Sequence, residues 1–224
     1  MNKEVHRPFT QYLSETQARR LHEAGLEILE RVGVYLYDQE SVDLYRKAGA
    51  RVEEDGLVYI PAKLAEWACS VAPKMITLHD RQGNPVMPLG KQQVYFGPGS
   101  DCLFVLDHKS GERRLGTLND VEQIIRVCDA LPNIDFLMSA CVPSDVPAER
   151  ANHRQMLAMI ENSSKPIMFV TNDFECSLDV VRAGEIVAGG DATHRQKPYT
   201  CCYINVTDPL RHNDESLQKL LCGL

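Results

Sequence analysis

The sequence predicts an α/β fold, in which N-terminal helices and a small antiparallel β segment precede the first three βα units of a TIM-type (β/α)8 barrel. Three short apolar runs begin at Ile134, Pro166 and Pro198, and their starts are 32 residues apart. Each run ends in a polar residue and is followed by a segment with helical periodicity, which is the pattern of successive parallel βα units. The predicted domains are therefore residues 1–116 and residues 117–224.

Three helices are predicted in the N-terminal part. Ser14-Glu15-Thr16-Gln17 is a capping box, and apolar residues then recur at helical spacing up to Gly33. A second helix is predicted from Asp38 to Ala48, with Gly49 as its cap, and a third from Pro61 to Val71. A short strand, 57–60, lies between the second and third helices.

The pattern changes between Met75 and Leu115 to short β-like runs separated by turn residues. The predicted strands are 76–78, 94–96 and 103–106, and glycine-containing turns separate them. This segment is the predicted small antiparallel β element. Thr117 or Asn119 then caps a helix that leads to the first repeat.

The three repeats favour a barrel over an open dinucleotide-binding sheet. The glycine-rich first turn of such a sheet is absent from 139–143, and no P-loop pattern occurs. A barrel of eight units would need about five more. The apolar pattern of the last helix, 217–224, stops without a cap, so we expect the chain to be a truncated, N-terminal portion of a larger fold.

Composition limits the classes of function. The net charge of -7 disfavours nucleic-acid binding, because phosphate neutralisation needs clustered Lys and Arg. The eight cysteines form no C-x-x-C pair, which favours reduced, mostly buried thiols and a cytoplasmic location. The start of the chain, 1–7, lacks a signal-peptide core, and no apolar run is long enough to span a membrane.

Polar residues at the carboxyl ends of the predicted strands form the candidate site, since barrel active sites lie at that face. Asp145 and Asp173 stand near predicted helix starts, as does Asp208, so helix capping and ligand binding are both open for these carboxylates. A glycine-containing loop, 97–101, allows close approach to a ligand, and neighbouring aromatic rings could cage a quaternary ammonium ion or form core. The candidate substrate-binding residues are Tyr95, Phe96, Gly97, Gly99, Asp101, Phe104, Ser139, Thr171, Asn172, Asn205 and Asp208.

Metal and thiol chemistry are not indicated. The seven histidines show no zinc-ligand spacing with cysteine, so no metal site is expected. Cys201 and Cys202 are adjacent in a predicted strand and point to opposite faces, and buried thiols are favoured over nucleophiles. Catalytic residues are not identified.

The order of several segments resembles the trimethylamine and glycine betaine methyltransferases that act with a corrinoid protein. The resemblance covers the whole chain, and its segments are 28–34, 48–52, 58–61, 96–99, 107–114, 131–135 and 208–211. It implies a βα barrel, about twice this length, that passes a methyl group from a quaternary or tertiary methylamine to the Co(I) cobamide of a separate corrinoid protein. It also implies that the chain binds no cofactor directly and that the full-length protein is a homo-oligomer. Because the repeats stop early, we expect these residues alone to be inactive.

Displacement of a neutral amine from a quaternary substrate requires orientation and charge stabilisation and no general acid. Two alternatives from other classes stay open. One is a non-catalytic binding or assembly module, and the other is a barrel enzyme of unrelated chemistry. For the trimethylamine branch of the family, the resemblance implies a pyrrolysine in the second half of the barrel, beyond Leu224.

Overall fold

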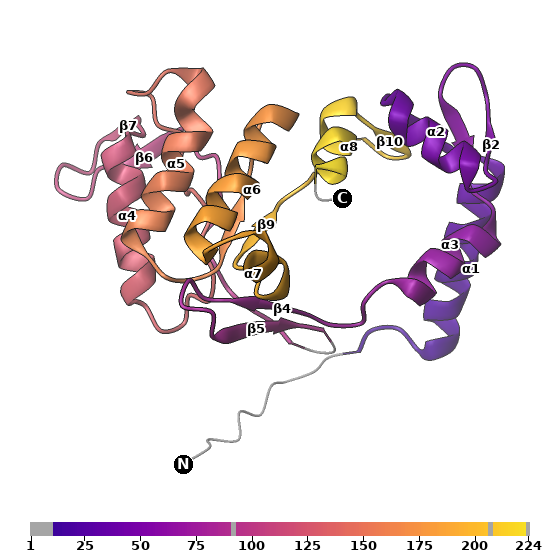
Figure 1. Cartoon of the computed structure of the whole chain (residues 1–224), viewed down its shortest axis with the longest axis horizontal. Helices are drawn as coiled ribbons and strands as arrows, with labels where there is room; N and C mark the ends of the chain where they lie inside the picture. Colours follow the sequence, from indigo (N-terminus) through magenta and orange to yellow (C-terminus); the bar gives the residue numbers. More distant parts are fainter. Residues whose placement is uncertain (1–10, 91–92, 206–207, 223–224) are drawn as a thin grey trace, which may run out of the picture. The chain divides into compact units, whose positions relative to one another are not determined.

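The computed structural model describes residues 11–90, 93–205 and 208–222, which form two compact units (Figure 1). The first unit comprises the described residues within Met1–Pro73 and Val206–Asp214, and the second comprises those within Lys74–Asn205 and Glu215–Leu224. This division falls at a different place from the one predicted at 116/117, which stays a prediction. No described helix is long and apolar enough to cross a membrane.

The first unit combines three helices with a four-stranded sheet. The helices begin and end close to the predicted residues, and Ser14 forms the predicted capping box with Gln17. The sheet has the order β10-β1-β3-β2, in which β1 pairs parallel with β10 and antiparallel with β3. The elements are α1 (Glu15–Arg31), β1 (Val34–Leu36), α2 (Gln39–Lys47), β2 (Arg51–Val52), β3 (Leu57–Tyr59), α3 (Ala62–Val71) and β10 (Arg211–His212).

The second unit begins with two separate antiparallel hairpins. The first joins β4 (Ile76–His79) to β5 (Pro85–Leu89), and the second joins β6 (Phe104–Leu106) to β7 (Arg113–Leu115). The predicted strands 76–78 and 103–106 are thus confirmed as antiparallel, each with a partner that the sequence pattern did not reveal. The predicted strand 94–96 is not present as a strand.

Parallel βα units follow, as the repeat predicted. The remaining elements are α4 (Leu118–Ala130), α5 (Ala148–Asn162), β8 (Ile167–Phe169), α6 (Phe174–Ala188), α7 (Asp191–Gln196), β9 (Thr200–Cys202) and α8 (Asp214–Leu221). Strands β8 and β9 pair in parallel, and the first repeat contributes a parallel bridge between Leu137 and Ile167. The described residues contain no closed barrel, so the eight-stranded barrel stays a prediction. Leu224 of the predicted last helix lies outside the described residues.

The core of the second unit lies between these parallel segments and three helices. Helices α4, α5 and α6 lie side by side (Figure 1), and α5 contacts both of its neighbours. The buried cluster includes Val121 and Ile125 from α4, Met159 from α5, and Leu137 and Ile167 from the parallel segments. This packing fixes one face of the strands, and therefore fixes the edge at which their carboxyl ends meet.

Arg114 ties the β6–β7 hairpin to the start of α4. Its guanidinium donates to both carboxylate oxygens of Asp120, at 2.6 and 2.8 Å, and to Asp107 at 3.2 Å. Asp120 also accepts a hydrogen bond from the backbone of Thr117, which completes a capping box. Hydrogen bonds from Arg114 hold the pKa of Asp120 well below its usual range, and backbone N–H groups of Ser110 and Lys109, with Arg114, lower the pKa of Asp107 to about 2.

Asp120→Asn is expected to lower the free energy of unfolding at pH 7 by about 1–2 kcal/mol, because it removes half of the capping box and the bidentate ion pair. The folded-state pKa of Asp120 is depressed, so its contribution is present above the ordinary carboxyl pKa of 3.8 and is lost as pH falls below it. Urea denaturation at pH 7 and pH 3 measures the difference in the free energy of unfolding between variant and wild type. We expect this difference to be smaller at pH 3.

The matched control is Glu27→Gln, which breaks an exposed ion pair with Arg31 on α1 and should change stability by less than about 0.5 kcal/mol. If Asp120→Asn lowered the free energy of unfolding by the same amount at both pH values, that result would contradict the ionic role assigned to Asp120.

Candidate functional site

The loop 97–101 does not form a hairpin between two strands, as the sequence suggested; it lies in a segment that runs parallel to the first repeat. Asp135 N donates to Phe96 O at 2.6 Å near one end, and Val142 N donates to Cys102 O at 3.0 Å at the other. Between them Ala140 N donates to Gly99 O at 3.0 Å, and Cys102 forms a parallel bridge with Cys141. The segment 96–102 is therefore a fourth parallel neighbour, beside 134–141, β8 and β9.

This pairing brings part of the predicted site together at one edge. Gly99 and Asp101 lie beside Ser139, because the segments that carry them are hydrogen-bonded to one another over 99–102 and 140–142. Thr171 and Asn205 follow β8 and β9, so their backbones end at the same carboxyl edge. The edge contains predicted residues from four successive parallel segments.

Two residues at this edge have strained backbones. Asp101 and Ala140 both have φ 62°, a left-handed conformation that residues other than glycine seldom adopt. Each directly precedes one of the two residues, Cys102 and Cys141, whose backbones form the parallel β-bridge. Such strain costs of order 1–3 kcal/mol and concentrates at functional sites, so its position here supports the carboxyl edge as the candidate site.

Side chains at the edge differ in what they can offer a ligand. Ser139 is buried, and Asn172 is exposed. The Thr171 hydroxyl is buried and lies 2.5 Å from that of Ser177, which donates to Asp173 O at 2.9 Å, so Thr171 supports the start of α6. The exposed residue Asn205 accepts a hydrogen bond from the Ser216 hydroxyl through its backbone carbonyl.

Two of the three carboxylates near predicted helix starts act as caps. Asp173 is the N-cap of α6 and accepts from Cys176 N at 2.7 Å. Asp145 accepts a hydrogen bond from Leu118 N at 2.9 Å. Leu118 is the first residue of α4, so Asp145 caps α4 and not α5, the helix that follows it in sequence. Asp208 belongs to the first unit, where it forms a bridge with Arg211 before β10. These contacts favour the capping interpretation for Asp145 and Asp173.

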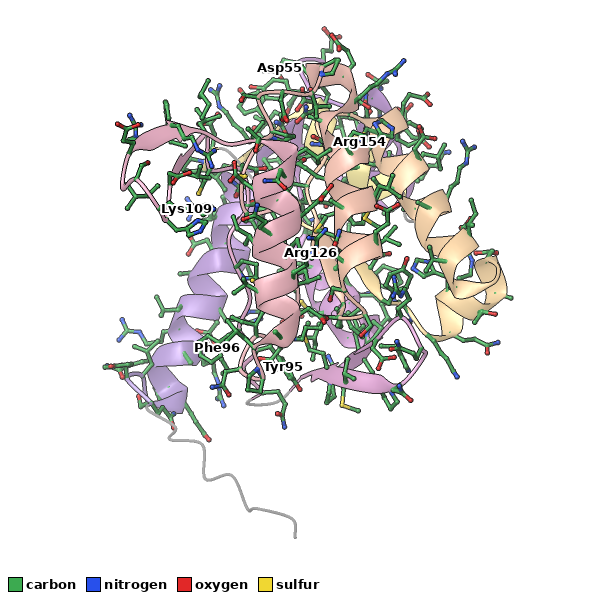
Figure 2. The ribbon with its side chains drawn as sticks, turned by 90° about the vertical axis from the view of Figure 1, so that its left-hand side faces the viewer. Asp55, Tyr95, Phe96, Lys109, Arg126 and Arg154 are labelled. Atoms are coloured by element: carbon green, nitrogen blue, oxygen red, sulfur yellow. The ribbon has the colours of Figure 1, made fainter. Side chains whose placement is uncertain are left out.

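Two of the three predicted aromatic residues, Tyr95 and Phe96, lie away from the carboxyl edge. Tyr95 and Phe96 lie close together at one end of α4, away from Lys109 in the β6–β7 turn (Figure 2). Phe96 pairs with Asp135 near the start of the first repeat, and the Tyr95 hydroxyl donates to Pro88 O at 3.1 Å. The Phe104 ring is covered by the Arg113 guanidinium at 3.5 Å. Tyr95 and Phe96 therefore belong to the amino end of the segments, and Phe104 already contacts a cation.

Gly97 allows the segment 96–102 to lie close to the first repeat. A Cβ atom at this position would lie 2.4 Å from the Phe136 ring, whereas a Cβ at Gly99 would meet no atom within 4 Å. Only a residue without a side chain leaves room for Phe136 here. Gly97 thus has a packing role beside the first repeat, and Gly99 is open.

Two contributors to the edge were not singled out from the sequence. Gln155 of α5 is buried and donates to Cys141 O at 2.8 Å, which fixes the backbone next to Ala140. Its signal was a polar residue within the apolar face of α5. Gly116 is the other, because a Cβ there would lie 2.9 Å from the Cys141 sulfur. Pairing between segments distant in sequence has no such local signal.

Three of the cysteines in this unit, Cys141, Cys176 and Cys202, have raised pKa values. Burial raises the pKa of Cys141, Cys176 and Cys202 to about 11 in each case, with nearby acidic groups adding to the effect. These values favour the buried-thiol interpretation over a nucleophilic one. Among the described residues, no group of three His, Cys, Asp or Glu side chains is arranged to hold a metal ion.

A cavity of about 370 Å³ is lined by residues of the last two repeats, among them Phe169 of β8 and Thr200 and Cys202 of β9. It is lined by α6, α7, β9 and α8, and His194 in its wall makes a contact of 2.9 Å with the Thr200 hydroxyl. Burial lowers the pKa of His194. None of the predicted substrate-binding residues lines this cavity.

Comparisons with known proteins agree on one family. The family model described as trimethylamine methyltransferase (MTTB) matches residues 2–222. A glycine betaine methyltransferase of Desulfitobacterium hafniense (strain Y51) is 29% identical over 211 residues, covering 93% of this chain and 43% of the relative. A trimethylamine methyltransferase of Methanosarcina thermophila is 27% identical over 220 residues, covering 92% of this chain and 44% of the relative. The chain thus spans less than half the length of these curated relatives.

Proposed function

Because the chain belongs to the trimethylamine methyltransferase (MTTB) family, we propose that the whole protein transfers a methyl group from a methylated amine to the Co(I) cobamide of a corrinoid protein. The observation that carries the proposal is the family match over residues 2–222. Relatives named glycine betaine methyltransferase and trimethylamine methyltransferase each match more than nine-tenths of the chain. The proposed substrate class is therefore a quaternary or tertiary methylamine.

The proposed reaction is displacement at a methyl carbon. The substrate nitrogen is cationic, either as a quaternary ammonium or as a tertiary amine that already carries a proton. The electron pair of Co(I) forms the new carbon–cobalt bond, the carbon–nitrogen bond breaks, and its pair stays on the departing neutral amine. A quaternary substrate leaves without needing a proton, so the site needs orientation, charge stabilisation and exclusion of water. In support, Asp145 and Asp173 near the carboxyl edge are engaged as helix caps and are not arranged as an acid/base pair.

Residues of the carboxyl edge would position the amine. Asp101 can face the cationic substrate with its carboxylate, and Ser139 can supply a hydroxyl beside it. The cobamide is a second substrate brought by the corrinoid partner, so this chain needs no cofactor of its own under the proposal. The proposal includes a cytoplasmic homo-oligomer that is inactive when reduced to these residues.

A chimera tests the proposal. Here the chain replaces the matched 43% of the Desulfitobacterium hafniense glycine betaine methyltransferase, so that the relative supplies what the chain does not span. Incubation with a Co(I) corrinoid protein and glycine betaine or trimethylamine is expected to convert the cobalt absorption spectrum to that of methyl-Co(III). The intact relative serves as positive control. A folded chimera that converts no methylated amine, quaternary or tertiary, would contradict the proposal.

Asp101→Asn and Ser139→Ala in the chimera are each expected to reduce kcat/KM for the amine about tenfold, the effect of losing one charged or hydrogen-bonded contact. Lys109→Ala is the matched control, because Lys109 lies in the exposed β6–β7 turn (Figure 2). Rates equal to that of the unmodified chimera for both edge variants would remove the carboxyl edge as the amine site while leaving the family assignment intact.

A further inference from the structure

A second, smaller cavity lies at the opposite end of the parallel strands. Its volume is about 100 Å³, and its lining includes the β4–β5 turn (residues 80–83), Thr193, Lys197 and Tyr199. Hydrogen bonds of 2.8 Å from His79 N to Pro198 O and from Arg81 N to Ser164 O hold that turn beside the residues that precede β9 and β8. The cavity is therefore at the amino ends of these strands and is separate from the candidate site.

Tyr199 places an unsatisfied donor at this cavity. Its side chain is 2% exposed, and its hydroxyl has no hydrogen-bond partner among the described residues. Buried hydroxyl groups are almost always paired, because leaving one unpaired costs free energy. Burial raises the pKa of Tyr199 to about 12, so the hydroxyl is a neutral donor. The positive charge of nearby Arg81 lowers this pKa, but by less than burial raises it. A partner from outside the polypeptide would satisfy the hydroxyl.

The charges around the cavity are predominantly positive. Arg81 uses one guanidinium nitrogen to donate to Ile160 O, which leaves its other N–H groups. Lys197 lies against Gly83, where a Cβ atom would be 3.2 Å from its Cδ and 3.4 Å from its Nζ. The one carboxylate, Asp80, is occupied within its own turn by Gln82 N and by two groups of Asn84.

We propose that this cavity binds a small oxyanion, such as phosphate or sulfate, whether free or as a terminal group of a larger metabolite. Two cations and a neutral hydroxyl donor suit an anion, since charge-assisted hydrogen bonds to oxyanions are short and strong. The volume exceeds what one water molecule needs, which is roughly 10–15 Å³ on the same measure. A bound oxyanion would link the β4–β5 turn, α7 and the start of β9.

Binding and stability of the 224-residue chain test the proposal without any enzymatic assay. Thermal unfolding and isothermal titration are run with sodium phosphate, sodium sulfate, sodium acetate and glucose 6-phosphate, each against sodium chloride at matched ionic strength. We expect phosphate or sulfate to raise Tm beyond the chloride control, because a ligand that binds only the folded state stabilises it. Binding of glucose 6-phosphate as tight as that of free phosphate would indicate that a phosphate group on a larger molecule is accommodated.

Tyr199→Phe is the decisive variant, since it removes only the hydroxyl. Without oxyanion its Tm should equal or exceed that of wild type, because the unpaired buried group is gone; with phosphate, its affinity should be about tenfold weaker. Tyr203→Phe, at an exposed tyrosine of the same strand region, is the matched control and should leave both quantities unchanged. Should Tyr199→Phe fail to fold, the exposed Lys197→Met carries the test with the same expected loss, and Lys109→Met is its control.

Two results would overturn the proposal. One is stabilisation by chloride equal to that by phosphate and sulfate, which would mean that the cavity holds water alone. The other is undiminished phosphate affinity in both Tyr199→Phe and Lys197→Met, which would place any binding elsewhere. Neither result depends on methyl transfer, so the proposal stands or fails independently of the proposed function.

Discussion

Leu137→Ala is expected to lower the free energy of unfolding of the second unit by about 3–5 kcal/mol, the upper part of the range for buried leucine truncations. Leu137 is 0% exposed and belongs to the core cluster between the parallel segments and helices α4 to α6. Its backbone also joins the first repeat to β8, through Leu137 N to Pro166 O and Met168 N to Leu137 O, both at 2.8 Å. The cavity left by Ala would therefore open where helix packing and strand pairing coincide.

Urea denaturation followed by far-UV circular dichroism measures this loss. Ile186→Ala is the matched control, because Ile186 is 79% exposed on α6 and its truncation should cost less than about 0.5 kcal/mol. A loss below about 1 kcal/mol for Leu137→Ala would mean that the first repeat does not pack at the centre of the second unit.

Local signals predicted the helices well because each signal lies within the element it defines. Ser14 and Thr117 both form capping boxes, Asp173 caps α6, and Gly189 ends it with φ 85°. The 32-residue spacing of the repeats likewise predicted successive parallel strands with helices between them, and β8 and β9 are such a pair. Helix α7 was missed, because six mostly polar residues show no apolar periodicity.

Pairings between distant segments could not be read in this way. Segment 96–102 joins the first repeat although nearly 40 residues separate Phe96 from Asp135, and β10 pairs with β1 across most of the chain. Backbone hydrogen bonds hold these pairings together, and nearly every residue type except proline can both donate and accept them. The sequence therefore suggested a hairpin loop at 97–101, where the structure has a parallel neighbour.

The candidate site was predictable to the extent that it depends on strand direction. Parallel strands place their carboxyl ends at one edge, so Ser139 was correctly grouped with neighbouring strand ends. The aromatic cage depended instead on residues being close in sequence. Phe96 and Asp101 lie toward opposite ends of the segment 96–102, because Phe96 O accepts from Asp135 N at the start of the first repeat, whereas Cys102, the residue after Asp101, pairs with Cys141 at its end. The structure brings Gly99 and Asp101 to Ser139, and places Tyr95 and Phe96 at the other end.

Gly97→Ala is expected to destabilise the second unit by about 2–3 kcal/mol, the cost of overpacking a close contact. The new methyl group would lie 2.4–2.6 Å from three atoms of the Phe136 ring, far inside van der Waals contact. Phe136 follows Asp135, whose backbone and carboxylate both bond Phe96. Moving the ring would disturb this pairing and, further along the segment, the position of Asp101 at the carboxyl edge.

Gly99→Ala is the matched control, because a Cβ there meets no atom within 4 Å, and it should be neutral within about 0.5 kcal/mol. Phe136→Leu combined with Gly97→Ala should recover at least half of the loss, since the smaller side chain makes room for the methyl group. Urea denaturation of Gly97→Ala, Phe136→Leu, the double variant and Gly99→Ala measures this coupling. The chimera reports whether methyl transfer falls with Gly97→Ala and returns in the double variant. Strictly additive losses would show that Gly97 and Phe136 are not in contact, and that the parallel pairing of 96–102 with the first repeat is wrong.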